Sequence, residues 1–231
     1  GKCYLSLDNL NTSANRGACV QPCRRGYEVT DRDKDITLAI ENEYIMSPKD
    51  LCTLPFLDKL LDAGVKILKI EGRGRSPEYT KVTVGVYSEA VDAIQKGEFT
   101  EEKITAWTER LRSVYNRDFW DGYYLGRKTG EWTQRYGSQA TKTKVFIGTV
   151  TNFFSKINVA EIRMETHDLK VGDDIMIIGP TTGVYEDKIS EIRVDLKAVD
   201  STEKGELCSI PTKDVIRRGD KVYKVIDAIN N

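Results

Sequence analysis

The spacing of hydrophobic residues changes near residue 144. Beyond it, apolar and polar positions alternate with the two-residue period of half-buried strands. Turn-forming pairs of glycine with aspartate or proline separate these segments. The clearest predicted strands are residues 145–150, 157–162, 174–178 and 221–225. Roughly six or seven short strands in so short a segment predict a small closed β-barrel.

Before residue 116 the patterns are more mixed. Residues 2–6 favour a short strand, and residues 8–26 are a polar segment without a period, as is usual for functional or disordered loops. Residues 27–40 contain short strand-like pieces around a charged turn. The segment 65–70 contains four apolar residues and two lysines, and this pattern predicts a further strand.

Three helices are predicted in the same part of the chain. The first begins at Ser47-Pro48, because serine is a good N-cap and proline suits the first helical position, and it ends at Gly64. The second covers residues 77–96. The third follows the N-cap Thr100 and extends to about residue 115.

The order of these elements predicts an α/β part at residues 1–115, an aromatic and glycine-rich connector at 116–143, and an all-β domain at 144–231. The first part contains only about two strand–helix units, too few to close a parallel barrel. We therefore expect the chain to be the C-terminal portion of a longer protein. A removed segment, another chain or a dimer partner would supply the rest.

Composition narrows the class of protein. Basic and acidic residues nearly cancel, with a net charge of -1, so the whole-chain charge does not support bulk binding to nucleic acid or to an anionic membrane. No apolar run is long enough to span a bilayer. The five cysteines are an odd number for a disulfide framework, which favours a reducing, cytoplasmic location.

Four of the five cysteines lie in the first quarter of the chain: Cys3, Cys19, Cys23 and Cys52. Thiolates suit zinc and iron–sulfur clusters, so these four are candidate metal and cofactor ligands. The alternative is that they are small buried apolar residues. Cys208 lies in a predicted strand and is expected in the core.

A second group of candidates follows the predicted strand 65–70. Glu71 stands at its end, where barrel enzymes carry catalytic residues, and it is a candidate general base, metal ligand or ion-pair partner for Arg73 or Arg75. A purely structural ion pair is the alternative. Arg24 and Arg25, together with Arg73 and Arg75, are candidates for an anion site, since guanidinium groups bind phosphate and carboxylate bidentately.

The sequence offers no recognisable protease constellation. The single histidine, His167, lies in the β domain in a predicted turn, far from any candidate nucleophile. A zinc-protease HExxH motif is also missing.

Four motifs occur in the order found in one known family. They are Gly-Lys-Cys-Tyr-Leu-Ser at 1–6, Asn-Arg-Gly-Ala-Cys-Val-Gln-Pro-Cys-Arg at 15–24, Tyr-Ile-Met-Ser-Pro-Lys-Asp-Leu at 44–51, and the segment 69–76. With these residues the chain resembles the collagenase-like peptidase U32 family over roughly its first 98 residues. Residues 144–231 resemble the family's small C-terminal β-barrel, which is similar to the second domain of translation elongation factors.

The resemblance implies a modified TIM barrel of which this chain holds a part. The family signature begins upstream of Gly1 with another cysteine, so we expect the site to be incomplete and this chain to be inactive alone. Some members are classed as collagenase-like proteases, others hydroxylate the wobble uridine of tRNA, and others bind an iron–sulfur cluster for oxygen-independent hydroxylation. By resemblance Cys3 and Cys19 match cluster ligands, with Cys23 or Cys52 as a further one.

Three functional hypotheses follow. The first is a U32 peptidase of unassigned mechanism that acts on peptides, with Glu71, Arg73 and Arg75 as catalytic residues. The second is a tRNA-modifying protein with an iron–sulfur cluster, or zinc, on the four cysteines. The third is a non-catalytic binding module. The expected partners are the substrate and the missing half of the domain, the latter from a second chain or a homo-oligomer, and no membrane.

Overall fold

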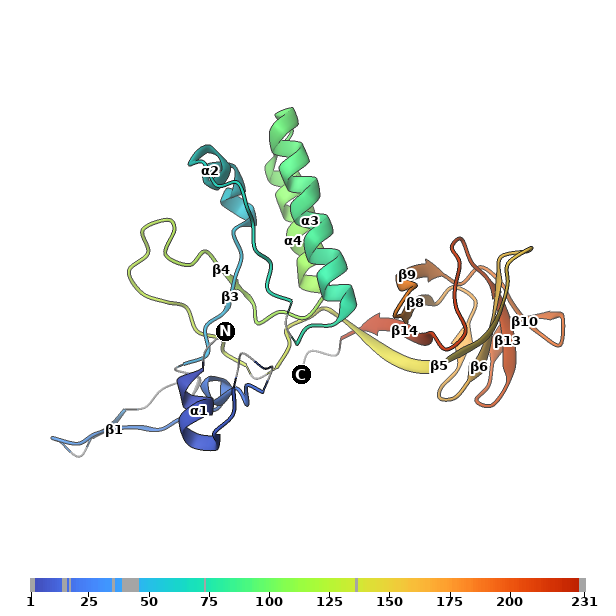
Figure 1. Ribbon diagram of the computed structural model, residues 1–231, viewed down its shortest axis with the longest axis horizontal. Helices are drawn as coiled ribbons and strands as arrows, with labels where there is room; N and C mark the ends of the chain where they lie inside the picture. Colours follow the sequence, from blue (N-terminus) through green and yellow to red (C-terminus); the bar gives the residue numbers. More distant parts are fainter. Residues whose placement is uncertain are drawn as a thin grey trace. The chain divides into compact units, whose positions relative to one another are not determined.

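The computed structural model describes residues 3–13, 16, 18–34, 36–38, 46–72, 74–135 and 137–228. The chain forms two compact units, Gly1–Ala140 and Thr141–Asn231 (Figure 1). Each unit has its own cluster of buried hydrophobic side chains. No helix in the described ranges is long and apolar enough to cross a membrane.

The N-terminal unit combines short helices, short strands and two long helices. In chain order its elements are α1 Tyr4–Leu10, η2 Pro22–Arg24, β1 Val29–Asp31, β2 Ile36–Leu38, β3 Asp50–Leu51, η3 Leu54–Phe56, α2 Leu57–Asp62, α3 Pro77–Lys96, α4 Glu101–Ser113 and β4 Phe119–Trp120. Strands β1 and β2 form an antiparallel hairpin, as the strand-like pieces at residues 27–40 predicted.

Helices α3 and α4 are the main support of this unit and confirm the two predicted helices. They lie side by side and run in opposite directions (Figure 1). Between them, Gly97 adopts a left-handed conformation with φ 70° that ends α3, and the Thr100 hydroxyl accepts a hydrogen bond from the Lys103 N–H that starts α4. Apolar side chains of α3 and α4 pack together with those of η3 and α2. The shared core contains Leu54 and Leu57 from η3 and α2, Val86, Ala90 and Ala93 from α3, and Ile104, Trp107 and Leu111 from α4.

Two local predictions in this unit are wrong. The predicted strand at residues 2–6 is instead the start of helix α1, because the Cys3 sulfur accepts a hydrogen bond from the Ser6 N–H and caps the helix. The helix predicted to begin at Ser47 begins only at Leu57. The Ser47 hydroxyl accepts a hydrogen bond from the Arg24 side chain instead of capping a helix, and the residues that follow form β3.

The strand predicted at residues 65–70 is also wrong. Among the described residues this segment pairs with no strand, and its Ile67 side chain is 87% exposed. An apolar run becomes a strand only when a partner satisfies its backbone groups. The described parallel pairing is limited to β3 with β4, so a partial TIM barrel is not confirmed.

The C-terminal unit confirms the predicted strands. In chain order it contains β5 Lys142–Phe154, β6 Val159–Met164, β7 Leu169–Lys170, β8 Asp174–Gly179, β9 Gly183–Lys188, β10 Ile192–Val194, β11 Lys197–Val199, β12 Ser201–Thr202, β13 Leu207–Pro211 and β14 Lys221–Asp227. Within the described residues, eight of these strands form one sheet in the order β11-β10-β13-β6-β5-β14-β8-β9.

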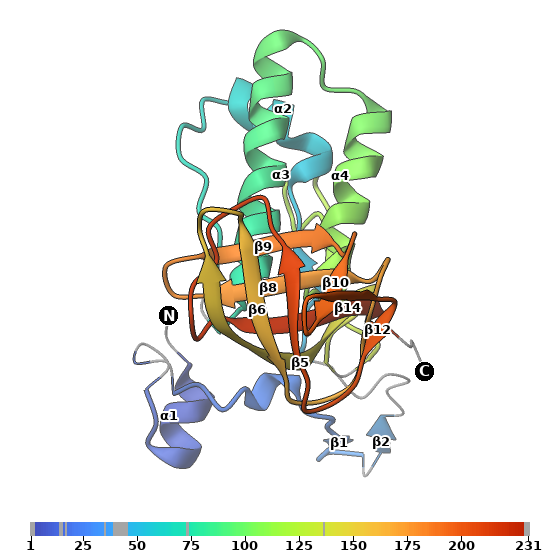
Figure 2. The same ribbon diagram turned by 90° about the vertical axis from the view of Figure 1, so that its right-hand side faces the viewer.

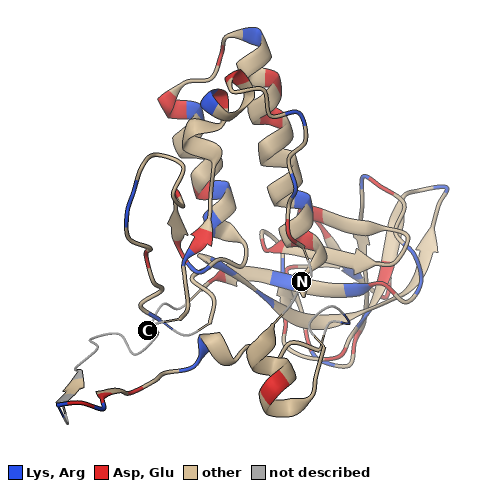
Figure 3. Ribbon diagram, turned by 60° about the vertical axis from the view of Figure 1, so that its left-hand side comes forward, with Lys and Arg blue, Asp and Glu red and all other residues tan. Residues whose placement is uncertain are grey.

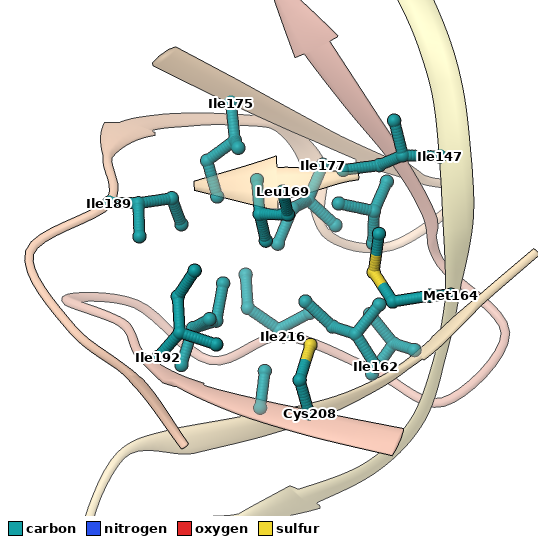
Figure 4. Packing of buried hydrophobic residues seen from close by; sticks show 14 of the residues in the cluster. Ile147, Ile162, Met164, Leu169, Ile175, Ile177, Ile189, Ile192, Cys208 and Ile216 are labelled. Carbon is teal, nitrogen blue, oxygen red and sulfur yellow. The ribbon is translucent and has the colours of Figure 1, made fainter. Parts of the chain in front are cut away.

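Every pairing in this large sheet is antiparallel. Register shifts in β5 and β14 bend the sheet, which curves around its own core (Figure 2). Strands β11 and β9 remain its two edges in the described part of the chain, so a closed barrel is not confirmed. Isoleucine, leucine and methionine side chains from facing strands fill the enclosed space (Figure 4).

The buried carboxylate of Asp220 fixes the turn that leads into β14. It accepts hydrogen bonds from the Thr182 hydroxyl at 2.5 Å and from the Arg217 N–H at 2.9 Å. A Cβ atom at Gly179 would lie 1.8 Å from its Oδ1 atom, so the close approach of β8 requires glycine there.

Candidate functional site

The N-terminal unit contains a cavity with a volume of about 580 Å³. Residues of η2, β3, β4, the segment 65–71 and helices α2, α3 and α4 line it. Its volume lies in the range typical of small-molecule sites, roughly 300–1,000 Å³. The cavity therefore brings the candidates Glu71, Arg24 and Arg75 to one place.

Asp50 is the carboxylate around which the charged side chains of the cavity gather. Its Oδ2 atom accepts a hydrogen bond of 3.0 Å from the backbone N–H of Arg117. Its Oδ1 atom lies 3.7 Å from Nη2 of Arg75 and 3.5 Å from Nη1 of Arg117. The β3–β4 pair holds this arrangement, because Asp50 lies in β3 and Arg117 precedes β4 by two residues.

Arg24 lies beside this cluster on a different element, the short helix η2. Its Nη1 atom donates to the Ser47 hydroxyl and to the Pro48 carbonyl, each at 2.9 Å. Burial, and to a lesser degree the nearby Arg117 cation, lower the pKa of Arg24. Arg24 and Arg117 both line the cavity, so two cations lie near one another in it.

Tyr115 forms the aromatic floor of the cluster. The guanidinium carbon of Arg75 lies 4.0 Å from the ring centroid, and that of Arg117 lies 5.2 Å from it. Both distances are within the range of cation–π contacts. The ring thus orients two guanidinium groups that approach from different segments of the chain.

The strand-end candidates are only partly described. Glu71 lines the cavity with an exposed side chain, and its charge contributes to the raised pKa of Tyr79, for which burial is the main cause. Arg75 joins the cluster around Asp50, as described above. Arg73 lies outside the described residues. Arg25 is exposed and does not line the cavity, so it lies apart from Arg24 and Arg75.

Cys3 and Cys19 meet at the buried side chain of Ser6. The Ser6 N–H donates to the Cys3 sulfur at 3.4 Å, and the Ser6 hydroxyl lies 3.6 Å from the Cys19 sulfur. Hydrogen bonds from Ser6 lower the pKa of Cys3, and the Cys19 thiol adds to this effect. The pair therefore contains one thiol that ionises more readily than usual.

The other two cysteine candidates have different surroundings. Cys52 is buried in the helical core, 3.9 Å from the Tyr87 hydroxyl, and burial raises its pKa. Cys23 is half-buried in η2. Among the described residues no three His, Cys, Asp or Glu side chains gather as a metal site. The described geometry thus brings Cys3 and Cys19 together at Ser6.

Two residues outside the cavity behave as the sequence predicted. Cys208 is buried in the core of the C-terminal unit, where burial raises its pKa to about 12. His167 lies in the bend between β6 and β7 with φ 53°. Neither position offers a nucleophile paired with a base.

Sequence reasoning missed Asp50, Arg117 and Tyr115. Asp50 belongs to a motif quoted for the family resemblance, yet there it was assigned to a helix. Arg117 and Tyr115 lie at the end of the third predicted helix and the start of the connector, where neither periodicity nor spacing indicates function. The available signal was the charged tetrad Tyr-Asn-Arg-Asp at 115–118, which stands between a helix and a strand.

The arginine cluster is not part of a broader basic face. Along the long helices, basic and acidic positions are interspersed (Figure 3). Exposed cations there have carboxylate neighbours, for example Arg110 with Glu89 and Lys103 with Glu98. The gathering of arginines at the cavity is therefore a local feature.

Comparison with known proteins matches residues 1–134 to the family model described as "Peptidase family U32". The chain is 53% identical over 224 residues to "Collagenase" of Porphyromonas gingivalis, covering 97% of this chain and 54% of that protein. It is 36% identical to "Uncharacterized protease MJ0090" of Methanocaldococcus jannaschii, covering 99% of this chain and 57% of that protein.

A more distant relative has a different name. The chain is 32% identical over 187 residues to "tRNA hydroxylation protein P1" of Bacillus subtilis, covering 78% of this chain and 43% of that protein. The chain thus spans about half the length of the curated relatives it matches.

Proposed function

The chain belongs to peptidase family U32, and from this premise we propose that the full-length protein is a collagenase-like peptidase that hydrolyses peptide bonds. The observation that carries the proposal is the 53% identity to a protein named collagenase over 97% of this chain. The relatives named for tRNA hydroxylation are more distant, the first at 32% identity.

We assign roles to the residues of the cavity as follows. Glu71 acts as the general base that takes a proton from the attacking water. Arg75 stabilises the negative charge that develops on the carbonyl oxygen, and Arg73 assists it. The exposed position of Glu71 at the cavity wall and the location of Arg75 in the same cavity support these roles.

We also propose a specific architecture for each of the two units. The N-terminal unit is a segment of a TIM-type barrel, completed by other residues of the full-length protein, a second chain or a homo-oligomer. The parallel β3–β4 pair supports this proposal. The C-terminal unit is a small β-barrel like the second domain of translation elongation factors, which the curved antiparallel sheet supports.

Cleavage of gelatin by the full-length protein tests the activity. Glu71→Gln keeps the shape of the side chain but removes the base, so kcat/KM should fall by about a hundredfold or more. Glu101→Gln, at an exposed position of α4, is the matched control and should retain activity. Intact gelatin with the wild-type protein would refute the peptidase proposal, whereas an active Glu71→Gln variant would refute only the role of Glu71.

The second candidate function is hydroxylation of the tRNA wobble uridine. The pairing of Cys3 with Cys19 supports it, since both would be ligands of an iron–sulfur cluster or zinc in the full-length protein, with Cys23 or Cys52 as a further ligand. Loss of the hydroxylated uridine in a deletion strain would favour it. Anaerobic protein should then contain iron and sulfide that Cys19→Ala removes.

If neither gelatin cleavage nor tRNA hydroxylation is found, a non-catalytic binding module becomes the better hypothesis. In all three cases we propose a cytoplasmic location. All five cysteines, each of them described, are free thiols, which supports a reducing compartment.

A further inference from the structure

We infer that the inner end of the cavity is a binding site for a carboxylate or phosphate group, formed by Arg24, Arg75 and Arg117 around Asp50 and Tyr115. The proposed peptidase chemistry uses Arg75 but neither Arg24 nor Arg117. The inference is therefore tested at Arg117 by binding alone, and it stands whether or not the protein cleaves peptides.

The first argument is the balance of charge. Among the described residues that line the cavity, four are cationic and two are anionic: Arg24, Lys69, Arg75, Arg117, Asp50 and Glu71. The side chains of Arg75 and Arg117 are only 16% and 10% exposed. Cations that are partly removed from water and lie near one another repel, unless an anion joins them.

The second argument is the length of the contacts that these arginines make. A charge-assisted hydrogen bond between guanidinium and carboxylate is typically about 2.7–2.9 Å long. Here the Oδ1 atom of Asp50 stands 3.7 Å from Arg75 and 3.5 Å from Arg117, and Gln21 accepts from Arg117 at 3.4 Å. A closed structural network would have shorter contacts. Within the described part of the chain, Arg75 and Arg117 therefore keep guanidinium donors that an incoming oxyanion can use.

The third argument is that the groups are held in place before any ligand arrives. Tyr115 lies under Arg75 and Arg117, the Arg117 backbone fixes Asp50, and two hydrogen bonds fix Arg24. Side chains that are already ordered lose little conformational entropy on binding. The planar fork of arginine also matches both oxygens of a carboxylate or phosphate.

The remaining wall of the cavity is largely apolar. Leu60, Leu68, Leu111 and Phe119 line it, next to the arginine end. A cavity with one cationic end and an apolar wall suits a ligand with an anionic group on an apolar body. A small aromatic or aliphatic acid, or the C-terminal carboxylate of a peptide, has this form.

Calorimetric titration of the full-length protein tests the inference with five probes. They are 3-phenylpropionate, its neutral amide, inorganic phosphate, and a short apolar peptide with either a free or an amidated C-terminus. We expect saturable binding of the charged probes and none of the amide. A preference between phosphate and phenylpropionate identifies the anionic group, and tight binding of the free-acid peptide alone identifies a peptide end.

Three variants tie binding to this site. Arg117→Gln and Arg117→Lys should each weaken binding by about tenfold to a hundredfold, because the lysine keeps the charge but loses the fork. Arg25→Gln removes a nearby exposed cation and should leave the affinity unchanged. If Arg117→Gln fails to fold, the charge-conserving Arg117→Lys still provides the test. Equal affinities in all variants, or no saturable binding, would overturn the inference.

Discussion

At the scale of single residues, Cys3 has surroundings unlike those of the buried thiols Cys52 and Cys208. It caps α1, and hydrogen bonds from Ser6 stabilise its thiolate. Cys52 and Cys208 are buried, and burial favours their protonated form. The same residue type therefore occupies one helix cap and two core positions.

This difference predicts selective alkylation. Because the pKa of Cys3 is lowered and those of Cys52 and Cys208 are raised, limiting iodoacetamide near neutral pH should label Cys3 well before the other two. Peptide mass spectrometry of the folded and urea-unfolded protein measures the order. Ser6→Ala should slow labelling of Cys3, since it removes the hydroxyl that lowers its pKa. Equal rates for Cys3 and Cys208 in folded protein would contradict the prediction.

The candidate site shows what can be read from single residues. The sequence singled out Arg24, Arg75 and Glu71, and the structure places all three at one cavity. It also pointed to Arg25, which lies outside, and overlooked Arg117. Arg24 ends η2 and is held by hydrogen bonds to Ser47 and Pro48, contacts that the sequence pattern does not reveal, whereas Arg25 follows η2 and is exposed.

At the scale of elements, helices with strong local signals were predicted well. α3 and α4 have a proline start, a glycine end and a threonine cap, and each of these acts through neighbouring residues. Strand β3 and the irregular segment 65–70 were not predicted. Their conformation depends on whether a strand distant in sequence pairs with them, and the hydrophobic pattern of a segment does not reveal its pairing partner.

The contact between α3 and α4 predicts a pH-dependent stability. Glu89 accepts hydrogen bonds from Arg110 at 2.5 and 2.9 Å and from the Trp107 indole at 2.9 Å. The hydrogen bonds from Arg110, first of all, lower the pKa of Glu89 in the folded state. Ionised Glu89 therefore stabilises the fold above its unfolded pKa, and this stabilisation is lost as the pH falls through the lowered folded value.

Glu89→Gln should reduce the free energy of unfolding by less than about 1 kcal/mol at neutral pH, because the pair is half exposed to water. The difference from wild type should vanish in acid below the folded pKa of Glu89. Urea unfolding at several pH values measures it. Glu101→Gln, at an exposed position, is the control and should change the free energy of unfolding less at neutral pH. If Glu89→Gln remained less stable than wild type in acid, the stabilisation would not come from the charge of Glu89.

At the scale of the whole molecule, the two units have separate cores. The core of the C-terminal unit draws on β5, β6, β8, β10, β13 and β14 and contains residues of that unit alone. Its strands were predicted from the period of two, whereas their order in the sheet was not. The order depends on which strands pair across long connections, a property of the assembled unit rather than of any one segment.

The separate core predicts that residues 141–231 fold without the N-terminal unit. The isolated fragment should unfold cooperatively in urea, as small domains usually do. Ile177→Ala, at a position with 0% exposure, should destabilise it by about 2–5 kcal/mol. Leu196→Ala, at 88% exposure, is the control and should change little. A broad, non-cooperative transition would show that the unit depends on the rest of the chain.

The short β3–β4 pair also has a consequence for the order of folding. The backbone N–H of Arg117 reaches Asp50 across 67 positions, and helices α2, α3 and α4 all lie within the loop that this contact closes. Joining the ends of so long a loop carries an entropy penalty that the helices reduce if they pack first. The arginine cluster should thus assemble late on the folding pathway, after the hydrophobic faces of the helices have met.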